Sequence, residues 1–335
     1  MASGFIGGGW SRLARKSTTS SSNPRDRSIT TAEGSKLPTL VCEMVIDFVA
    51  RQVTSQSLWY PDIAKTLRAC SLTCRAWTPR SQYHLFRFLA VRCSNKHVRS
   101  IVAFLNKNPV LQSRVEVLVI KPRSRLNTTL DNIPTEITDL LFQVRELRLS
   151  GCFLRVTAAS TLENSLGRFT FVTSFNIYNA GFESFNDLQR IITSFPRLRK
   201  LSIYSPRWWI PKSDLPNLVS VHTSLRLFEI DIAVSANWLQ DERGAAFLEW
   251  LASSGIVLSL TKLMLDQTMT TTDTALSAVQ TVVHAAANTL QCIAFSPGPD
   301  LDYTECACVL YSLAIVTESL LWLFQSAKRW RAALI

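Results

Sequence analysis

An apolar pattern that returns at a near-constant spacing organises most of this 335-residue chain. Two apolar residues enclose one variable position, and a third apolar residue lies three positions before them. Seven copies follow one another from about residue 115, with gaps of 29, 28, 26, 27, 35 and 30 residues between their central members. Such a period predicts a repeated structural unit. The central members are Leu118, Leu147, Phe175, Leu201, Phe228, Leu263 and Ile293.

Each copy predicts a short strand, because alternate side chains of a strand point to the same face. Residues 184–195, 240–252 and 272–288 follow strands and have the composition of covering helices. Stacked units of this kind bury a continuous core. A period in the twenties is typical of leucine-rich repeats, so we expect an irregular leucine-rich-repeat solenoid over 115–306. Leu147, Phe175 and Leu201 should then be buried on successive strands of one curved parallel sheet. An ordinary α/β domain is the alternative.

The region before the repeats is predicted to be helical. Residues 1–36 are expected to form a disordered basic tail, and 37–90 to form a small module of three helices. Apolar residues recur at helical spacing up to about Val53 and again over 62–78, where Pro79 is expected to end the second helix. A third helix is expected over 81–89, and a connecting helix over 91–114. Residues 307–335 are predicted to form an apolar C-terminal helix, either atypical or truncated, that packs on the array; a membrane span is the alternative.

The helical module carries residues that resemble an F-box. The opening matches Leu37-Pro38-x-Leu40-x-x-Glu43-x-Val45-Ile46, the second half matches Leu67-Arg68-Ala69-Cys70-Ser71-Leu72-Thr73-Cys74-Arg75-Ala76-Trp77, and the exit matches Tyr83-His84-Leu85-Phe86. The chain is similar to the F-box-like proteins abundant in mushroom-forming fungi, in which a helical box precedes a divergent repeat region. Leu40 stands where the family usually has an acidic residue.

The resemblance implies a substrate-recognition adaptor of a cullin–RING (SCF-type) ubiquitin ligase. The module would dock on the Skp-type adaptor, and the repeats would hold a protein target. A small helical unit with more apolar residues than its core needs is suited to such docking. An alternative is that the same residues pack the module against the first repeat, which we expect of Cys74. By position, the docking residues would be Leu37, Pro38, Val45, Ile46, Leu67, Leu72, Cys74 and Trp77.

The positive charge of the chain is concentrated in one block. Residues 65–125 hold thirteen Lys and Arg against Glu116 alone, within a formal net charge of +11. Such a block suits an acidic partner or is a solvated basic face. The alternative function is therefore a nucleic-acid-associated repeat protein that uses 65–125. Phosphate binding would weaken steeply with salt, whereas apolar docking would not.

No motif for catalysis, a cofactor or a metal is present in the sequence. The chain lacks a phosphate-binding loop, a dinucleotide fingerprint, a nucleophile elbow and a zinc-protease motif. Its four histidines are scattered and its eight cysteines form no C-x-x-C pair. We therefore expect a non-enzymatic protein without cofactor or metal. The cysteines and the lack of a secretory signal indicate a reduced, cytoplasmic or nuclear protein, with no membrane partner.

The target is expected to bind the concave face of the repeats. There the variable residue between the two apolar ones faces outward. These positions mix charge, amide, hydroxyl and thioether, which suits a protein surface better than a phosphate backbone. The predicted row is Arg148, Asn176, Ser202, Glu229 and Met264.

Overall fold

Eight five-residue strands, each with apolar residues at its second and fourth positions, form the main sheet of this mixed α/β protein. The computed structural model describes residues 38–51, 60–123, 133, 135–154, 164–182, 184–204, 207–208, 225–233, 242–266, 273–296 and 308–309. The strands are β1 (Phe88–Arg92), β2 (Val117–Lys121), β3 (Glu146–Ser150), β5 (Ser174–Tyr178), β7 (Lys200–Tyr204), β9 (Glu229–Ala233), β10 (Lys262–Asp266) and β11 (Cys292–Ser296).

These strands are parallel, and each one pairs with the next along the chain in the order β1-β2-β3-β5-β7-β9-β10-β11. The short β12 (Cys308–Val309) closes the far edge in antiparallel orientation. A second, three-stranded parallel sheet repeats the same order with β4 (Phe153–Leu154), β6 (Gly181–Phe182) and β8 (Arg207–Trp208). Strands that follow one another in the chain therefore lie side by side in both sheets.

One hydrogen-bond arrangement returns at the start of six strands. The carbonyl of Glu116 accepts from the backbone N–H groups of Arg145 and Glu146, and the carbonyl of Arg145 accepts from those of Thr173 and Ser174. The same forked bond recurs with the carbonyls of Thr173, Arg199, Phe228 and Thr261. Each carbonyl lies just before a strand, so the segments that precede neighbouring strands satisfy each other's backbone groups.

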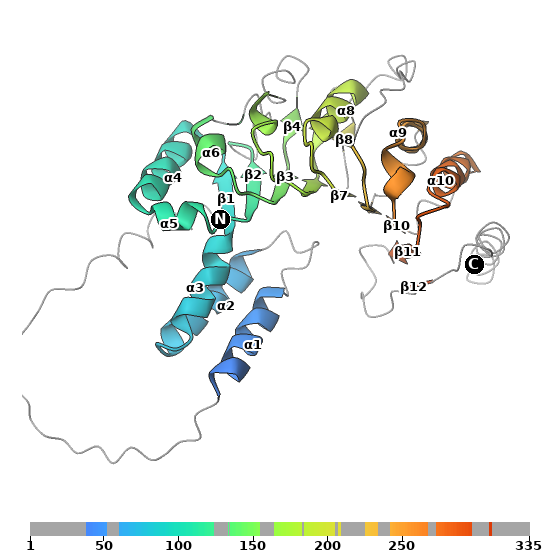
Figure 1. Cartoon of the computed structure of the whole chain (residues 1–335). Helices are drawn as coiled ribbons and strands as arrows, with labels where there is room; N and C mark the ends of the chain where they lie inside the picture. Colours follow the sequence, from blue (N-terminus) through green and yellow to red (C-terminus); the bar gives the residue numbers. More distant parts are fainter. Residues whose placement is uncertain are drawn as a thin grey trace, which may run out of the picture.

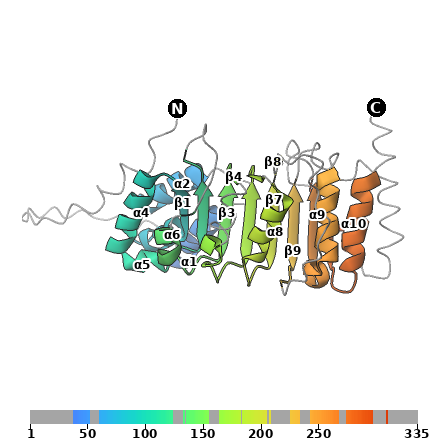
Figure 2. The ribbon, with the colours of Figure 1, turned by 90° about the horizontal axis from the view of Figure 1, so that it is seen from above.

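Helices cover one face of the sheet (Figures 1 and 2). Between them and the strands lies the core, which includes Leu147, Phe175 and Leu201, all at 0% exposure and paired in register on β3, β5 and β7. This confirms the prediction that the three are buried on successive strands of one parallel sheet. The helices are α4 (Asn95–Lys107), α5 (Pro109–Gln112), α6 (Thr135–Leu140), α8 (Phe185–Thr193), α9 (Glu242–Ser253), the 3-10 helix η2 (Ile256–Ser259) and α10 (Asp273–Ala285).

Local sequence explains how α8 begins and how β3 and β5 end. The hydroxyl of Ser184 accepts from the N–H of Asp187, and the Asp187 carboxylate accepts from the N–H of Ser184, which is the capping box that starts α8. Gly151 and Asn179 directly follow β3 and β5, and both have left-handed backbone angles, with φ of 67° and 47°. Glycine and asparagine tolerate this conformation best, so equivalent turns carry suitable residues.

The three N-terminal helices lie on the opposite face, near the first strands (Figure 1). They are α1 (Thr39–Arg51), α2 (Tyr60–Thr73) and α3 (Thr78–Arg87). α3 ends at Arg87 and β1 begins at Phe88 without an intervening residue. The helical module is therefore joined directly to the sheet.

Several predicted boundaries are wrong. Residues 88–92 form β1, so the sheet begins one strand before the predicted start at 115. α2 ends at Thr73, and Pro79 lies in the first turn of α3 rather than ending a helix. Proline is tolerated there because its missing N–H would have no helical partner. The connecting segment contains two helices, α4 and α5, rather than one.

At the C-terminal end, only 308–309 of the predicted helix 307–335 is described, and it is the strand β12. The remainder of that prediction, the predicted tail 1–36 and most of the linker 54–61 lie outside the described residues. Among the helices that the structure describes, none is long and apolar enough to cross a membrane.

Candidate protein-docking surface

The helix α1 has apolar residues on two faces, and only one of them is buried. Cys42 and Ile46 are 8% and 0% exposed. The opposite face is a stripe of large apolar side chains left in solvent, with Met44 at 62% and Phe48 at 64% exposure. The full stripe, called here the α1 apolar face, is Leu40, Val41, Met44, Val45 and Phe48.

The spacing of these residues explains why they form one surface. Residues four apart lie one above the other on a helix, so Leu40, Met44 and Phe48 form one row. Val41 and Val45 form a parallel row beside it. Isolated exposed apolar residues are common, but a contiguous exposed patch on a short helix marks an interaction site.

The sequence-predicted docking residues divide into accessible and buried groups. Pro38, Val45, Leu72 and Cys74 are exposed, with Leu72 at 77%, and Trp77 is half-buried. The exposure of Cys74 contradicts the expectation that it packs against the first repeat. Leu37 lies outside the described residues.

Two of the predicted docking residues are not accessible. Ile46 and Leu67 are 0% and 1% exposed, because they face the interior of the three-helix module. Their role is to hold the helices together, which corrects the prediction that they contact a partner. On the α1 apolar face, the docking prediction left out four accessible residues, Leu40, Val41, Met44 and Phe48. The i, i+4 spacing was a signal for them, but it did not say which apolar face of α1 is covered.

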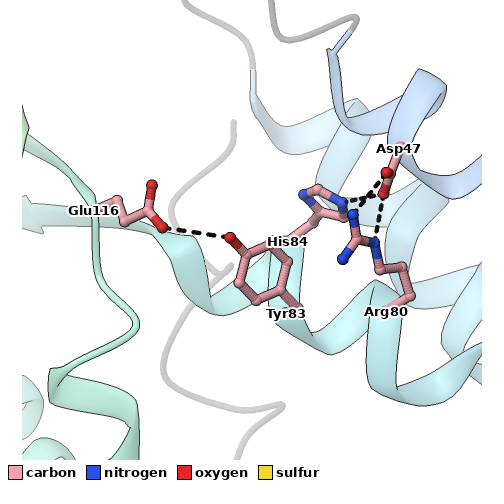
Figure 3. A network of polar contacts seen from close by, with 5 residues as sticks. All are labelled: Asp47, Arg80, Tyr83, His84 and Glu116. Carbon is pink, nitrogen blue, oxygen red and sulfur yellow. Dashed lines mark hydrogen bonds and ion pairs between the residues drawn. The ribbon is translucent and has the colours of Figure 1, made fainter. Parts of the chain in front are cut away.

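A polar network fixes α1 on α3 and α3 on the sheet (Figure 3). Asp47 of α1 accepts two hydrogen bonds from Arg80, from Nε at 2.6 Å and Nη2 at 2.7 Å. The Nε2 atom of His84 lies 2.8 Å from the same carboxylate. A two-pronged guanidinium–carboxylate pair defines orientation as well as distance. The α1 apolar face is therefore presented at a set angle.

The link from α3 to the sheet uses Glu116, which directly precedes β2. Tyr83 donates to its Oε1 at 3.4 Å, and Arg87 donates from Nε to its Oε2 at 2.8 Å. The Arg80 guanidinium also lies over the Tyr83 ring, 5.3 Å from its centroid. A cleft of about 330 Å3 opens between the module and the first strands, lined among others by Arg80, Tyr83 and His84. Its charged groups are largely paired with one another.

We expect the Asp47 pair to contribute stability that depends on pH. Hydrogen bonds from Arg80 hold the pKa of Asp47 well below its ordinary value, with His84 acting in the same direction. A lowered carboxyl pKa contributes stability above the pKa of unfolded aspartate, about 3.9, and loses it as pH falls further. Asp47→Asn should cost about 1–2 kcal/mol at pH 7, and this difference should narrow at pH 3.

Urea denaturation of both proteins at the two pH values measures this effect. Asp139→Asn is the matched control, because Asp139 pairs with Arg168 at an exposed site, where side-chain exposures are 61% and 49%. That change should cost less than about 0.5 kcal/mol. An equal cost for the two variants at pH 7 would contradict the assigned role of Asp47.

The predicted target row lies on the face of the sheet opposite α4, α6, α8, α9 and α10 (Figure 1). Arg148, Asn176 and Ser202 are aligned on β3, β5 and β7, as predicted. They are 9%, 3% and 0% exposed, however, so they are not open to a target as the prediction required. Met264 is half-buried on β10.

Neighbouring side chains cover this row. Glu146 accepts from Arg148 Nε at 2.6 Å and from Asn176 Nδ2 at 2.8 Å, and Arg148 lies 5.6 Å from the centroid of the Phe88 ring. A row of long side chains on adjacent strands shields its own members, because equivalent positions are only about 5 Å apart. The buried polar groups therefore stiffen the sheet.

Glu229 does not belong to that row. Its register partners are Lys200 on β7 and Lys262 on β10, and Asp231 takes the position beside Ser202. The repeat pattern was placed two residues early in the fifth unit, at Phe228 instead of Ile230. Phe228 is 40% exposed, because it occupies the turn position whose carbonyl accepts the forked hydrogen bond.

Three residues of this face form a buried cluster that the sequence analysis did not predict. Tyr178 and Tyr204 are register partners whose rings stack 4.6 Å apart and 2° from parallel, and the Tyr204 hydroxyl donates to Asp231. Burial raises the pKa of Asp231, while the Tyr204 hydrogen bond lowers it. A tyrosine at the fifth position of two successive strands was the available sequence signal.

Among the described residues, no group of three or more histidine, cysteine or carboxylate side chains is arranged to hold a metal ion. Neither the protein-family models nor the curated proteins contain a match to this chain.

Proposed function

We propose that the chain is a substrate-recognition adaptor of a cullin–RING ubiquitin ligase. Its helical module, which resembles an F-box, docks on a Skp-type adaptor. The observation that carries this proposal is the α1 apolar face, on which Met44 and Phe48 stay more than 60% exposed. Full burial of one large apolar side chain contributes roughly 1.5–3 kcal/mol. A partner that covers several of them therefore gains substantial affinity.

The arrangement of the remaining elements supports this role. α3 passes directly into β1, and Glu116, just before β2, bonds to Tyr83 and Arg87 of α3. A protein docked on α1 is therefore held at a set position relative to the sheet. The sequential parallel strands and their forked hydrogen bonds support the leucine-rich-repeat assignment of the array. Such an array offers a broad surface, which fits an adaptor.

The experiment that tests this function is direct binding between the purified full chain and a purified Skp-type adaptor of a mushroom-forming fungus. We expect a one-to-one complex with a Kd near or below the micromolar range, as for other apolar helix docking. The affinity should change little up to about 0.5 M NaCl, because apolar contacts are not screened. No complex at about 50 µM of folded chain would contradict the proposal.

We propose that the protein target binds the accessible charged row at the start of the strands. This row consists of Glu146, Ser174, Lys200, Glu229 and Lys262, which are register partners on successive strands. Lys200 and Glu229 keep 37% and 43% of their side chains exposed and form an ion pair of 3.0 Å. Alternating charges of this kind give specificity toward a complementary protein surface. Glu229 thus remains a target residue, in a different row from the predicted one.

Reversing both lysines, Lys200→Glu with Lys262→Glu, should reduce target recovery in proximity labelling by tenfold or more. Recovery of the Skp-type adaptor should stay unchanged, because α1 is not altered. The control reverses two exposed bases elsewhere, Lys107→Glu with Arg114→Glu. A labelling profile that is the same for both double variants would place target recognition outside the charged row.

A further inference from the structure

A strongly basic cavity lies where β1 and β2 end and α4 begins. Its volume is about 470 Å3, within the range of ligand pockets. Ser94, Asn95 and Lys96 line it from the start of α4, Arg99 lies one turn further along, and Arg123 follows β2. Among the described residues, no carboxylate belongs to this lining.

Two further cations lie close in sequence to the cavity but are not part of its lining. Arg92 and Lys121 are the last residues of β1 and β2 and are register partners, each two residues before a residue of the lining. Within the described part of the chain, Arg92, Lys121 and the three basic residues of the lining form no ion pair. Burial lowers the pKa of Lys121, and the nearby charge of Arg92 lowers it further. Three cations therefore line the cavity, and no carboxylate of the described residues pairs with them.

The backbone adds to this positive potential. Ser94 caps α4 without a side-chain hydrogen bond, and the first turn contains no acidic residue. The N–H groups at the start of a helix carry a partial positive charge that favours anions. This contribution supplements the cavity, whose guanidinium and ammonium groups supply most of the charge.

We propose that this cavity binds a small soluble molecule that carries two or more phosphate groups. Arginine donates in a fork that matches phosphate oxygens, and lysine adds a compact charge. A single dianionic phosphate would leave one of the three positive charges of the lining uncompensated, whereas two or more phosphates would balance all of them. This site is independent of the α1 apolar face and of the charged row.

The distribution of the other bases disfavours a nucleic acid as the ligand. Arg80 and Arg87, from the same basic block, are neutralised by Asp47 and Glu116. A nucleic-acid backbone requires cations spaced along a track. Lys96, Arg99 and Arg123 instead converge on one cavity, which suits a compact ligand.

The test is isothermal titration of the full chain with tripolyphosphate. We expect saturable binding that is at least tenfold tighter than that of inorganic phosphate. Lys96→Ala with Arg99→Ala should weaken tripolyphosphate binding about a hundredfold, roughly tenfold for each cation removed. Both side chains are exposed, so the variant should keep the wild-type circular dichroism spectrum.

The matched control is Lys107→Ala with Arg114→Ala, which removes the same charge from the same basic block outside the cavity. It should leave tripolyphosphate affinity within twofold of wild type. An equal loss in both variants, or no binding by the wild-type chain, would overturn the proposal. Tighter binding of a single-stranded oligonucleotide or a phosphoserine peptide than of tripolyphosphate, lost on the cavity substitutions, would also overturn it in favour of a macromolecular ligand.

Discussion

Replacing Met44 and Phe48 with glutamate should abolish binding of the folded chain to the Skp-type adaptor. Both side chains are more than 60% exposed in the absence of a partner, so their replacement should cost the chain little stability. In the complex, each glutamate would place a carboxylate in an apolar contact, where loss of hydration is unfavourable. We expect a loss of affinity of at least a hundredfold, which corresponds to about 2.7 kcal/mol.

The control for this variant replaces two exposed apolar side chains outside the helical module with glutamate. Phe142 and Leu258 are 48% and 51% exposed and lie outside the helical module, so Phe142→Glu with Leu258→Glu should leave adaptor affinity unchanged. Ile46→Ala is unsuitable as a test because it disrupts the interior of the module. If the folded variant Met44→Glu with Phe48→Glu binds the adaptor with an affinity within threefold of wild type, the adaptor binds another surface and the role of the α1 apolar face is contradicted.

Replacing Phe175 with alanine should destabilise the array by about 3–5 kcal/mol. The Phe175 ring is fully buried, lies 5.0 Å from the ring centroid of Phe195, and has Leu147 and Leu201 as register partners on either side. Its removal would leave a cavity beneath three neighbouring strands. Because these strands share that part of the core, local unfolding should begin there.

Urea denaturation followed by circular dichroism measures this loss, and hydrogen exchange locates it. Phe142→Ala removes the same atoms from an exposed position and should change stability by less than about 0.5 kcal/mol. Amides of β3, β5 and β7 should lose the most protection in Phe175→Ala. A cost below about 1 kcal/mol would show that the sheet is not packed as tightly at Phe175 as its burial indicates.

The positions of most strands could be predicted from the sequence because their burial pattern is local. A strand with one covered face needs apolar residues at alternate positions, and Leu147, Phe175 and Leu201 met that need at a regular spacing. The same reasoning identified the helices that became α8, α9 and α10. In the fifth unit, an exposed apolar residue at the turn, Phe228, imitated the pattern and shifted the prediction by two residues.

The tertiary structure alone decided which residues are accessible. α1 is apolar on two faces, so its own periodicity could not distinguish the buried Ile46 from the exposed Val45; the positions of α2 and α3 decide this. Arg148 and Asn176 were predicted to face a target, but side chains on adjacent strands bury them. Likewise, Arg99 and Arg123 share a cavity only because a parallel sheet brings the ends of its strands to one edge. Accessibility depends on neighbours far apart in the chain, and a local pattern does not contain them.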